Sequence, residues 1–183
     1  PQALLPTILS RCQRCTFQSI PTPELLGGLV NLHGLKEEEA QLPAWLSGGS
    51  MGKALAYVSG SLGEARGEAV RLAISLGRTG PLEALELAEK ISESKDKAYF
   101  MLEVLICWYR DLLVYRESEE VGFLYNPDLA ADVQREAEGY ETGRLVEIIE
   151  AVETAKNKIE TNANTRLALE ALFLKLARLL APA

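Results

Sequence analysis

The sequence is poor in the residues that most often carry catalytic chemistry. It contains one histidine, His33, and three cysteines among 183 residues. A Ser-His-Asp or Cys-His set needs a histidine beside a nucleophile, and nothing in the sequence ties His33 to one. Three cysteines with no visible signal peptide do not make a disulfide framework. The cysteine content therefore predicts a reducing, cytoplasmic setting.

The few cysteines also argue against a metal site. Cys12 and Cys15 form a C-x-x-C pair, but a structural zinc site needs four ligands. Beyond this pair the chain offers only Cys107 and His33. We therefore expect buried thiols at positions 12 and 15, and no metal.

A phosphate-binding loop is missing as well. The stretch SGGSMGKAL superficially suggests one, but the motif needs a glycine five residues before the Gly-Lys pair and a serine or threonine after it. Those two positions hold Ser47 and Ala54. We expect this chain to hydrolyse no nucleotide by itself and to contain no cofactor of its own.

Long hydrophobic runs and positive charge are scarce. The longest apolar run, Ala98 to Tyr109, is interrupted by Glu103 and is far shorter than the roughly 20 residues of a membrane span. The net charge is −7, and such a surface repels nucleic-acid phosphates. Only the first 20 residues, with Arg11 and Arg14 and no acid, are suited to meet an anion.

The remaining sequence favours an all-α protein. Apolar residues at helical spacing, separated by glycine and proline, predict two groups of helices. The first group comprises three short helices within 23–34, 37–49 and 50–60. The second group comprises longer helices at about 64–77, 81–92, 96–117, 127–138, 142–160 and 164–180. The last of these is apolar almost all round, so it is either central in its bundle or faces another subunit.

One segment, CTFQSIP, differs from the rest because its alternation predicts a short β-strand, with Cys15 and Phe17 on one face. A single strand cannot satisfy its own backbone groups. We therefore expect its partners in sequence upstream of Pro1, which would make the chain part of a longer protein.

Arg11 stands immediately before this strand, in the acid-free segment. A guanidinium group offers a planar set of donors that suits phosphate oxygens and stays charged at physiological pH. An arginine placed in this way can stabilise the charge that develops in phosphoryl transfer on another molecule. An ordinary surface arginine is the alternative.

Several motifs resemble one family. LLPTILSRCQ, with Ser10, Arg11 and Cys12, resembles the end of the AAA+ ATPase core in bacterial clamp-loader subunits. GSMGKAL is similar to the sensor-2 segment of their lid domain, with Lys53 where many relatives have arginine. WYRDLL and TNANTRLALEALFLKL resemble the collar domain of the delta-prime subunits of DNA polymerase III.

The resemblance implies three parts: a C-terminal remnant of the AAA+ core at 1–20, a helical lid at 21–63 and a helical collar at 64–183. It also implies that Arg11, flanked by its motif neighbours Ser10 and Cys12, is an arginine finger offered in trans to ATP on a neighbouring subunit. Lys53 would be the sensor-2-like residue toward the nucleotide.

The same resemblance implies partners and a process. The collar would assemble with gamma/tau and delta subunits in a ring that loads the sliding clamp onto primed DNA, as part of a DNA polymerase holoenzyme. Gamma/tau subunits share Ser-Arg-Cys but usually read G-S-M-R-D-A at sensor 2, so Gly52-Lys53 favours delta-prime. A gamma/tau-type ATPase subunit and an unrelated helical oligomerisation scaffold remain the alternatives.

Overall fold

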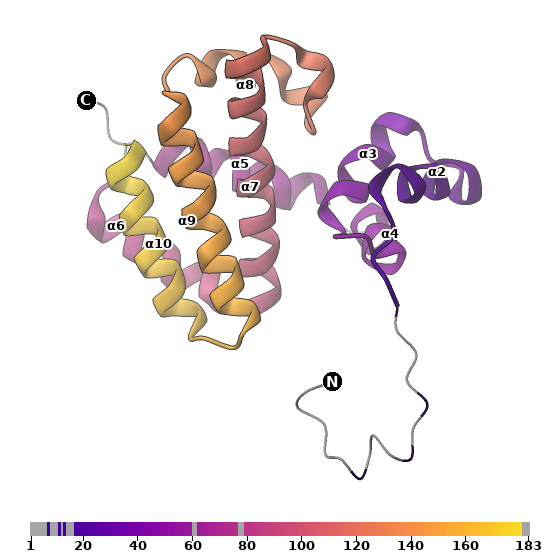
Figure 1. Cartoon of the computed structure of the whole chain (residues 1–183). Coiled ribbons are helices and arrows are strands. Elements are labelled where there is room, and N and C mark those ends of the chain that lie inside the picture. Colours follow the sequence, from indigo (N-terminus) through magenta and orange to yellow (C-terminus); the bar gives the residue numbers. More distant parts are fainter. Residues whose placement is uncertain are drawn as a thin grey trace.

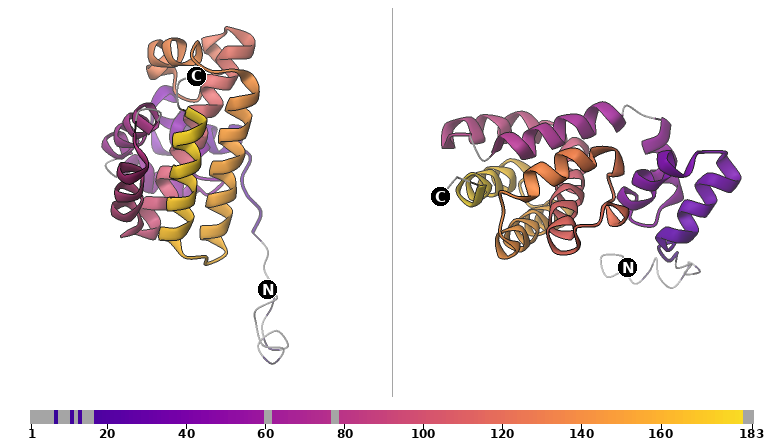
Figure 2. Two further views of the ribbon diagram at one scale, coloured as in Figure 1. Left: turned by 90° about the vertical axis from the view of Figure 1, so that its left-hand side faces the viewer. Right: turned by 90° about the horizontal axis from the view of Figure 1, so that it is seen from above.

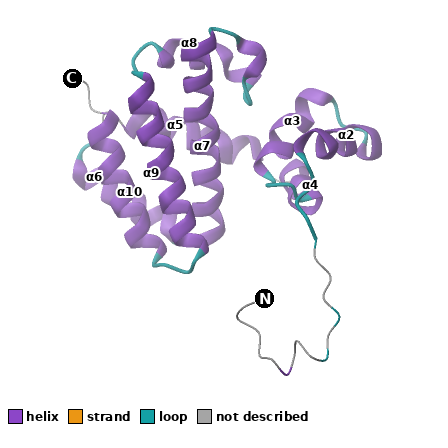
Figure 3. Ribbon diagram, in the orientation of Figure 1, coloured by secondary structure: helices purple, strands orange, loops and turns teal. Residues whose placement is uncertain are grey.

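The computed structural model describes residues 7, 11, 13, 17–59, 62–76 and 79–180. All regular structure in this part is helical (Figures 1 and 3). The elements are α2 (Thr22–His33), α3 (Glu37–Leu46), α4 (Met51–Ser59), α5 (Leu62–Leu76), α6 (Pro81–Ser92), α7 (Lys95–Ser118), the 3-10 turns η1 (Val121–Phe123) and η2 (Pro127–Leu129), α8 (Ala130–Ala137), α9 (Thr142–Glu160) and α10 (Thr165–Leu180). None of the helices in the described ranges is both long and apolar enough to cross a membrane.

The predicted all-α fold is confirmed, whereas the predicted strand is not found. Residues 17–20 carry no strand, and Cys15 and Thr16 lie outside the described residues. A β-ladder needs a neighbouring strand, and the described part of the chain supplies none. Instead, the amide of Ile20 donates a hydrogen bond to the carbonyl of Gly49 at 2.9 Å, which fixes the end of the segment on the turn between α3 and α4.

Gly49 is required at this turn for two reasons. Its φ is +83°, in the left-handed region that side chains rarely adopt. A Cβ there would also lie 2.6 Å from Cβ of Ser19 and 2.9 Å from the backbone of Ile20. Gly49 therefore allows the incoming segment to approach this turn closely.

Helices α2 to α4 form a small unit with its own apolar cluster. Three acids in the first turn of α3 favour its start through the helix dipole, and Gly34, with φ +71°, ends α2. The fully packed positions are few: Leu25, Leu29, Ala40, Ala44 and Ala54. A core of this size gives the unit little independent stability.

Helices α5 to α10 form a larger bundle in two layers. In Figure 1, α7, α9 and α10 lie side by side, with α9 in the middle, and α5 and α6 lie behind them; the view from above in Figure 2 shows the second layer from its edge. Helix α8 covers one end of α7. Trp108, Tyr109 and Phe173 are the largest side chains of its buried core.

The nearly all-apolar α10 packs on more than one side, against α6 and α9 and also against α5. Its buried side chains are Ala168, Leu169, Leu172, Phe173, Leu176 and Leu180. Leu167 is 63% exposed. Of the two sequence interpretations, the packing within its own bundle accounts for most of its apolar surface.

We expect Phe173→Ala to lower the free energy of unfolding by about 3–5 kcal/mol, because it leaves a cavity in the larger core. Leu167→Ala, on the same helix but exposed, should cost less than about 1 kcal/mol. Urea unfolding followed by circular dichroism measures both. Equal losses for the two variants would contradict the assignment of Phe173 to the core.

Candidate functional site at the junction of the two helical units

The residues singled out in the sequence are not gathered at one place. Arg11 is exposed in a turn, and Ser10 and Cys12 lie outside the described residues. Lys53 is exposed on α4, with its Nζ 5.5 Å from the centre of the Tyr99 ring on α7. Within the described part of the chain no contact joins Arg11 to Lys53, so the structure does not bring the two together.

Lys53 belongs to a cluster that links α4 to the larger bundle. Nζ of Lys156, on α9, lies 5.0 Å from the same Tyr99 ring. The Tyr99 hydroxyl donates a hydrogen bond to Glu160. A cation over an exposed aromatic ring contributes about 0.5–1 kcal/mol. The observed contact of Lys53 is thus a modest attraction between the small unit and α7.

A second link from α4 ends on a buried carboxylate. The Tyr57 hydroxyl donates to Oε2 of Glu103 at 3.0 Å, and Nζ of Lys156 lies 3.3 Å from Oε1. Glu103 is only 6% exposed, so these partners offset the cost of burying its charge. Burial, followed by the charge of Glu103, raises the pKa of Tyr57, which keeps the phenol protonated as a donor.

Asp111, on α7, organises the loop that carries the other half of the junction. Its side chain is completely buried. Its oxygens accept hydrogen bonds from the amides of Tyr125 at 2.8 Å and Asn126 at 2.9 Å, and from Nδ2 of Asn126 at 2.6 Å. Arg110 completes the set with an ion pair of 3.1 Å. The carboxylate therefore fixes residues 125–126 against α7.

The loop held by Asp111 presents Tyr125 to the small unit. The Tyr125 ring stacks on Trp45 of α3, with centroids 3.9 Å apart and planes at 22°. The guanidinium of Arg110 lies 3.6 Å from the centre of the same ring. Stacked aromatic pairs contribute about 0.5–1.5 kcal/mol beyond the area that they bury. The stack of Trp45 on Tyr125 is thus one apolar contact at this junction, beside Leu46 of α3, which is buried in the core of the larger bundle.

Arg66, on α5, joins the same loop. Its Nε donates to Oδ1 of Asn126 at 3.0 Å, and its two terminal nitrogens donate to both oxygens of Asp128 at 2.8 and 2.7 Å. These hydrogen bonds hold the pKa of Asp128 below its ordinary value. The guanidinium is already occupied by protein acceptors.

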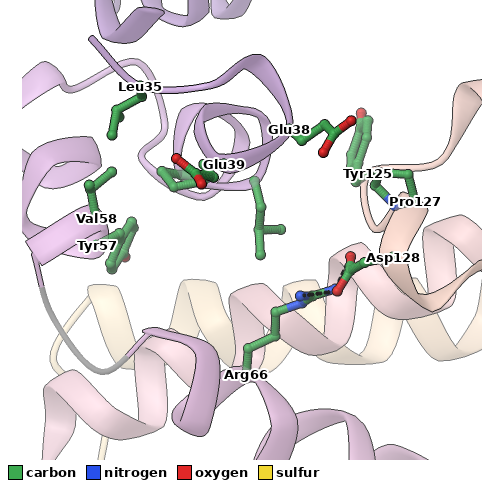
Figure 4. A pocket seen from close by; sticks show the side chains of 11 residues that line it. Leu35, Glu38, Glu39, Tyr57, Val58, Arg66, Tyr125, Pro127 and Asp128 are labelled. Carbon is green, nitrogen blue, oxygen red and sulfur yellow. Dashed lines mark hydrogen bonds and ion pairs between the residues drawn. The ribbon is translucent and has the colours of Figure 1, made fainter. Parts of the chain in front are cut away.

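A cavity of about 710 Å³ lies between the small unit and this loop. Figure 4 shows Glu38 and Glu39 on the α3 side and the paired Arg66 and Asp128 on the other. Apolar and aromatic side chains complete the lining: Leu35, Leu42, Pro43, Tyr57, Val58, Tyr125 and Pro127. The lining is acidic, because it has three carboxylates and one guanidinium, and that guanidinium is already bonded to Asn126 and Asp128.

Two kinds of reactive group can be examined among the described side chains: a cysteine nucleophile and a metal-binding cluster. Burial raises the pKa of the Cys107 thiol to about 12, so this cysteine forms no thiolate nucleophile at neutral pH. In the described ranges, no group of three or more His, Cys, Asp or Glu side chains is arranged to hold a metal ion.

Sequence reasoning missed most of this junction. Asp111 lies within WYRDLL, which was used only as a family motif. An acid amid apolar residues was the available signal for a buried carboxylate, and Glu103 gave the same signal. Arg66 and Asp128 are 62 residues apart, and no local sequence pattern predicts an ion pair over such a separation.

We expect Asp111→Ala to lower the free energy of unfolding by about 2–4 kcal/mol, because it leaves buried amides without an acceptor. Asp96→Ala, in the exposed first turn of α7, should cost less than about 1 kcal/mol. Chemical unfolding of both variants measures the difference. A loss at Asp111 no larger than at Asp96 would show that the loop is held by other contacts.

We also expect the Arg66–Asp128 pair to stabilise the protein in a pH-dependent way. Because the folded-state pKa of Asp128 is lowered, its contribution is complete above its unfolded-state pKa and is lost as pH falls through the lower folded-state value. The stability gap between wild type and Asp128→Asn should therefore be full at pH 6 and shrink below about pH 4. Its size should stay below about 1 kcal/mol, because the Asp128 side chain is 61% exposed.

Thermal unfolding of both proteins from pH 3 to pH 7 measures this gap. Glu83→Gln, an equal charge change on α6, controls for the net charge. A gap that does not change with pH would contradict the role given to the Asp128 carboxylate.

Comparison with known protein families shows to which family the chain belongs. The family model described as DNA polymerase III, delta subunit, C terminal matches residues 69–178, which cover α6 to α9 completely, about half of α5 and most of α10. No curated protein matches the chain. The match covers more than half of the sequence, and the chain belongs to this family of C-terminal domains of DNA polymerase III clamp-loader subunits.

Proposed function

We propose that the chain is the C-terminal portion of a delta-prime-type clamp-loader subunit that assembles through its α5–α10 bundle. The observation that carries this proposal is the family match over residues 69–178. Association with other clamp-loader subunits follows from the family. The finer proposal is that residues 64–183 form the collar, residues 21–63 the lid and residues 1–20 the end of an AAA+ core.

The second part of the proposal concerns Arg11. The Ser10-Arg11-Cys12 motif, the lack of acids in residues 1–20 and the exposure of Arg11 support a finger directed at ATP on a neighbouring subunit. The amide of Ile20, bonded to Gly49, would hold the base of this segment. Lys53 is proposed as the sensor-2-like residue, and its contact with Tyr99 supports a further role in holding the lid on α7.

The proposed partners are gamma/tau and delta subunits through the collar. The sliding clamp and primed DNA would be met only through the assembled ring, in the cytoplasm. The net charge of −7 supports this indirect route, because an acidic surface disfavours direct contact with DNA.

A delta-type subunit is the second candidate, since the matching family model is described by that subunit. Such a subunit would share the bundle but would not depend on Arg11 as a finger. The two candidates therefore predict different outcomes when Arg11 is replaced.

In the full-length protein, we expect Arg11→Ala to slow ATP hydrolysis at the neighbouring subunit's site by at least about 10-fold. The reason is that one hydrogen-bond donor to the transferring phosphoryl group is lost. Arg14→Ala, in the same acid-free segment, should leave the rate within about two-fold of wild type. Steady-state phosphate release measures the rate, and gel filtration monitors assembly. Unchanged ATPase with intact assembly would contradict the finger and favour the delta-type candidate.

We also expect the chain to form a defined complex with the collar region of a gamma/tau subunit from the same source. Multi-angle light scattering of each protein alone and of the mixture gives the masses. Ring assembly with full-length subunits is the companion measurement. Failure of the chain in both would contradict the collar assignment.

A further inference from the structure

We propose that the cavity between α3, α4 and the 125–128 loop is a docking site for a basic segment of a partner protein. The occupant would be an arginine or lysine side chain beside an apolar residue. This inference goes beyond the proposed function and does not depend on it, because it rests on the lining of the cavity alone.

The charges of the lining favour a cation. Glu38 and Glu39 are exposed, and neither carboxylate pairs with any described residue. Asp128 is 61% exposed beside its arginine partner, so its oxygens keep further acceptor capacity. The cavity thus contains carboxylates that can bind a positively charged group.

The same lining disfavours an anion. Arg66 is the one basic residue that lines the cavity, and its donors already serve Asn126 and both oxygens of Asp128. A phosphate would have to displace an intramolecular carboxylate and would still face Glu38 and Glu39. The site therefore does not suit a nucleotide or nucleic acid.

The apolar part of the lining favours a side chain with a long stem over a simple ion. Leu35, Leu42 and Pro43 line the cavity, and Val58, 36% exposed, adds an open apolar surface. Arginine and lysine lay their methylene stems along such surfaces while the charged head reaches a polar rim. The Tyr57 ring lines the same space (Figure 4) and suits a neighbouring cation.

The size of the cavity fits a short segment. A volume of about 710 Å³ lies within the range of about 300–1,000 Å³ that is typical of ligand sites. It has room for a cationic side chain together with a neighbouring apolar one. The cavity lies between the two helical units, so an occupant would touch both of them at once.

The test uses the isotopically labelled chain and two peptides in an NMR titration. The probe is acetyl-Leu-Arg-Leu-Arg-amide, and its control replaces both arginines by citrulline, which has the same shape without the charge. We expect the arginine peptide to shift the amide signals of Val58 and Asp128 and to bind about 3- to 10-fold more tightly than the citrulline peptide. Equal affinity for the two peptides would overturn the proposal.

Matched variants locate the effect. Glu38→Gln with Glu39→Gln should weaken binding of the arginine peptide about 3- to 10-fold. Glu83→Gln with Glu86→Gln makes the same charge change in exposed positions at the start of α6 and should leave the affinity within two-fold. Equal weakening by both pairs would mean that the peptide senses only the net charge, and the proposal would fail.

A third variant tests the cavity even if the protein with Glu38→Gln and Glu39→Gln does not fold. Val58→Lys retains both glutamates and places a cation of the chain itself in the cavity. We expect it to abolish the peptide-induced shifts, whereas Val146→Lys on α9, also at an exposed valine, should not. Retained binding by Val58→Lys would exclude the cavity as the docking site.

Discussion

The buried carboxylate of Asp111 is the constraint on which the arrangement of the two helical units depends. A charge taken fully out of water is costly unless it is paired and hydrogen-bonded, and here two backbone amides, one side-chain amide and Arg110 surround it. Apart from Arg110, the donors come from residues 125–126. Fixing them brings Tyr125 under Trp45 and Asn126 beside Arg66. These contacts of the junction thus depend on one buried carboxylate on α7.

The interactions at the junction differ in kind from those inside the bundle. Helices α7, α9 and α10 bury continuous apolar surfaces, and such packing is lost only by unfolding. The junction relies on the Trp45–Tyr125 stack, the contact of Lys53 with the Tyr99 ring, the Tyr57–Glu103 hydrogen bond and the burial of Leu46. The stack and the cation–aromatic contact contribute about 1.5 kcal/mol or less each. The small unit adds only five fully packed positions of its own. Its orientation can therefore change at far smaller cost than the fold of the bundle.

The helices could be predicted from the sequence because periodicity is a local property. The expected helix over 142–160 coincides with α9, and the expected helix over 127–138 begins as a 3-10 turn before α8. The predicted strand is not shown over residues 17–20, where the amide of Ile20 bonds to Gly49 of a turn, a contact that alternation cannot reveal. The polar network around the cavity joins residues that are far apart in the sequence: Tyr57 and Glu103 are 46 residues apart, and Arg66 and Asp128 are 62 residues apart. Arg66 and Asp128 look like ordinary surface charges until the fold brings them together.

The proposed finger and the junction are connected through Gly49. If Arg11 meets a neighbour's ATP, a force on its segment is transmitted to the small unit at Ile20, whose amide is bonded to the Gly49 carbonyl. Gly49 lies in the short turn between α3 and α4, and these two helices carry Trp45 and Tyr57. Those side chains make the contacts with Tyr125 and Glu103 that hold the small unit on the bundle. A displacement at the finger would therefore act first on these contacts, before it reached the α7–α9–α10 core. In such an arrangement the bundle keeps its place in an assembly while the small unit moves.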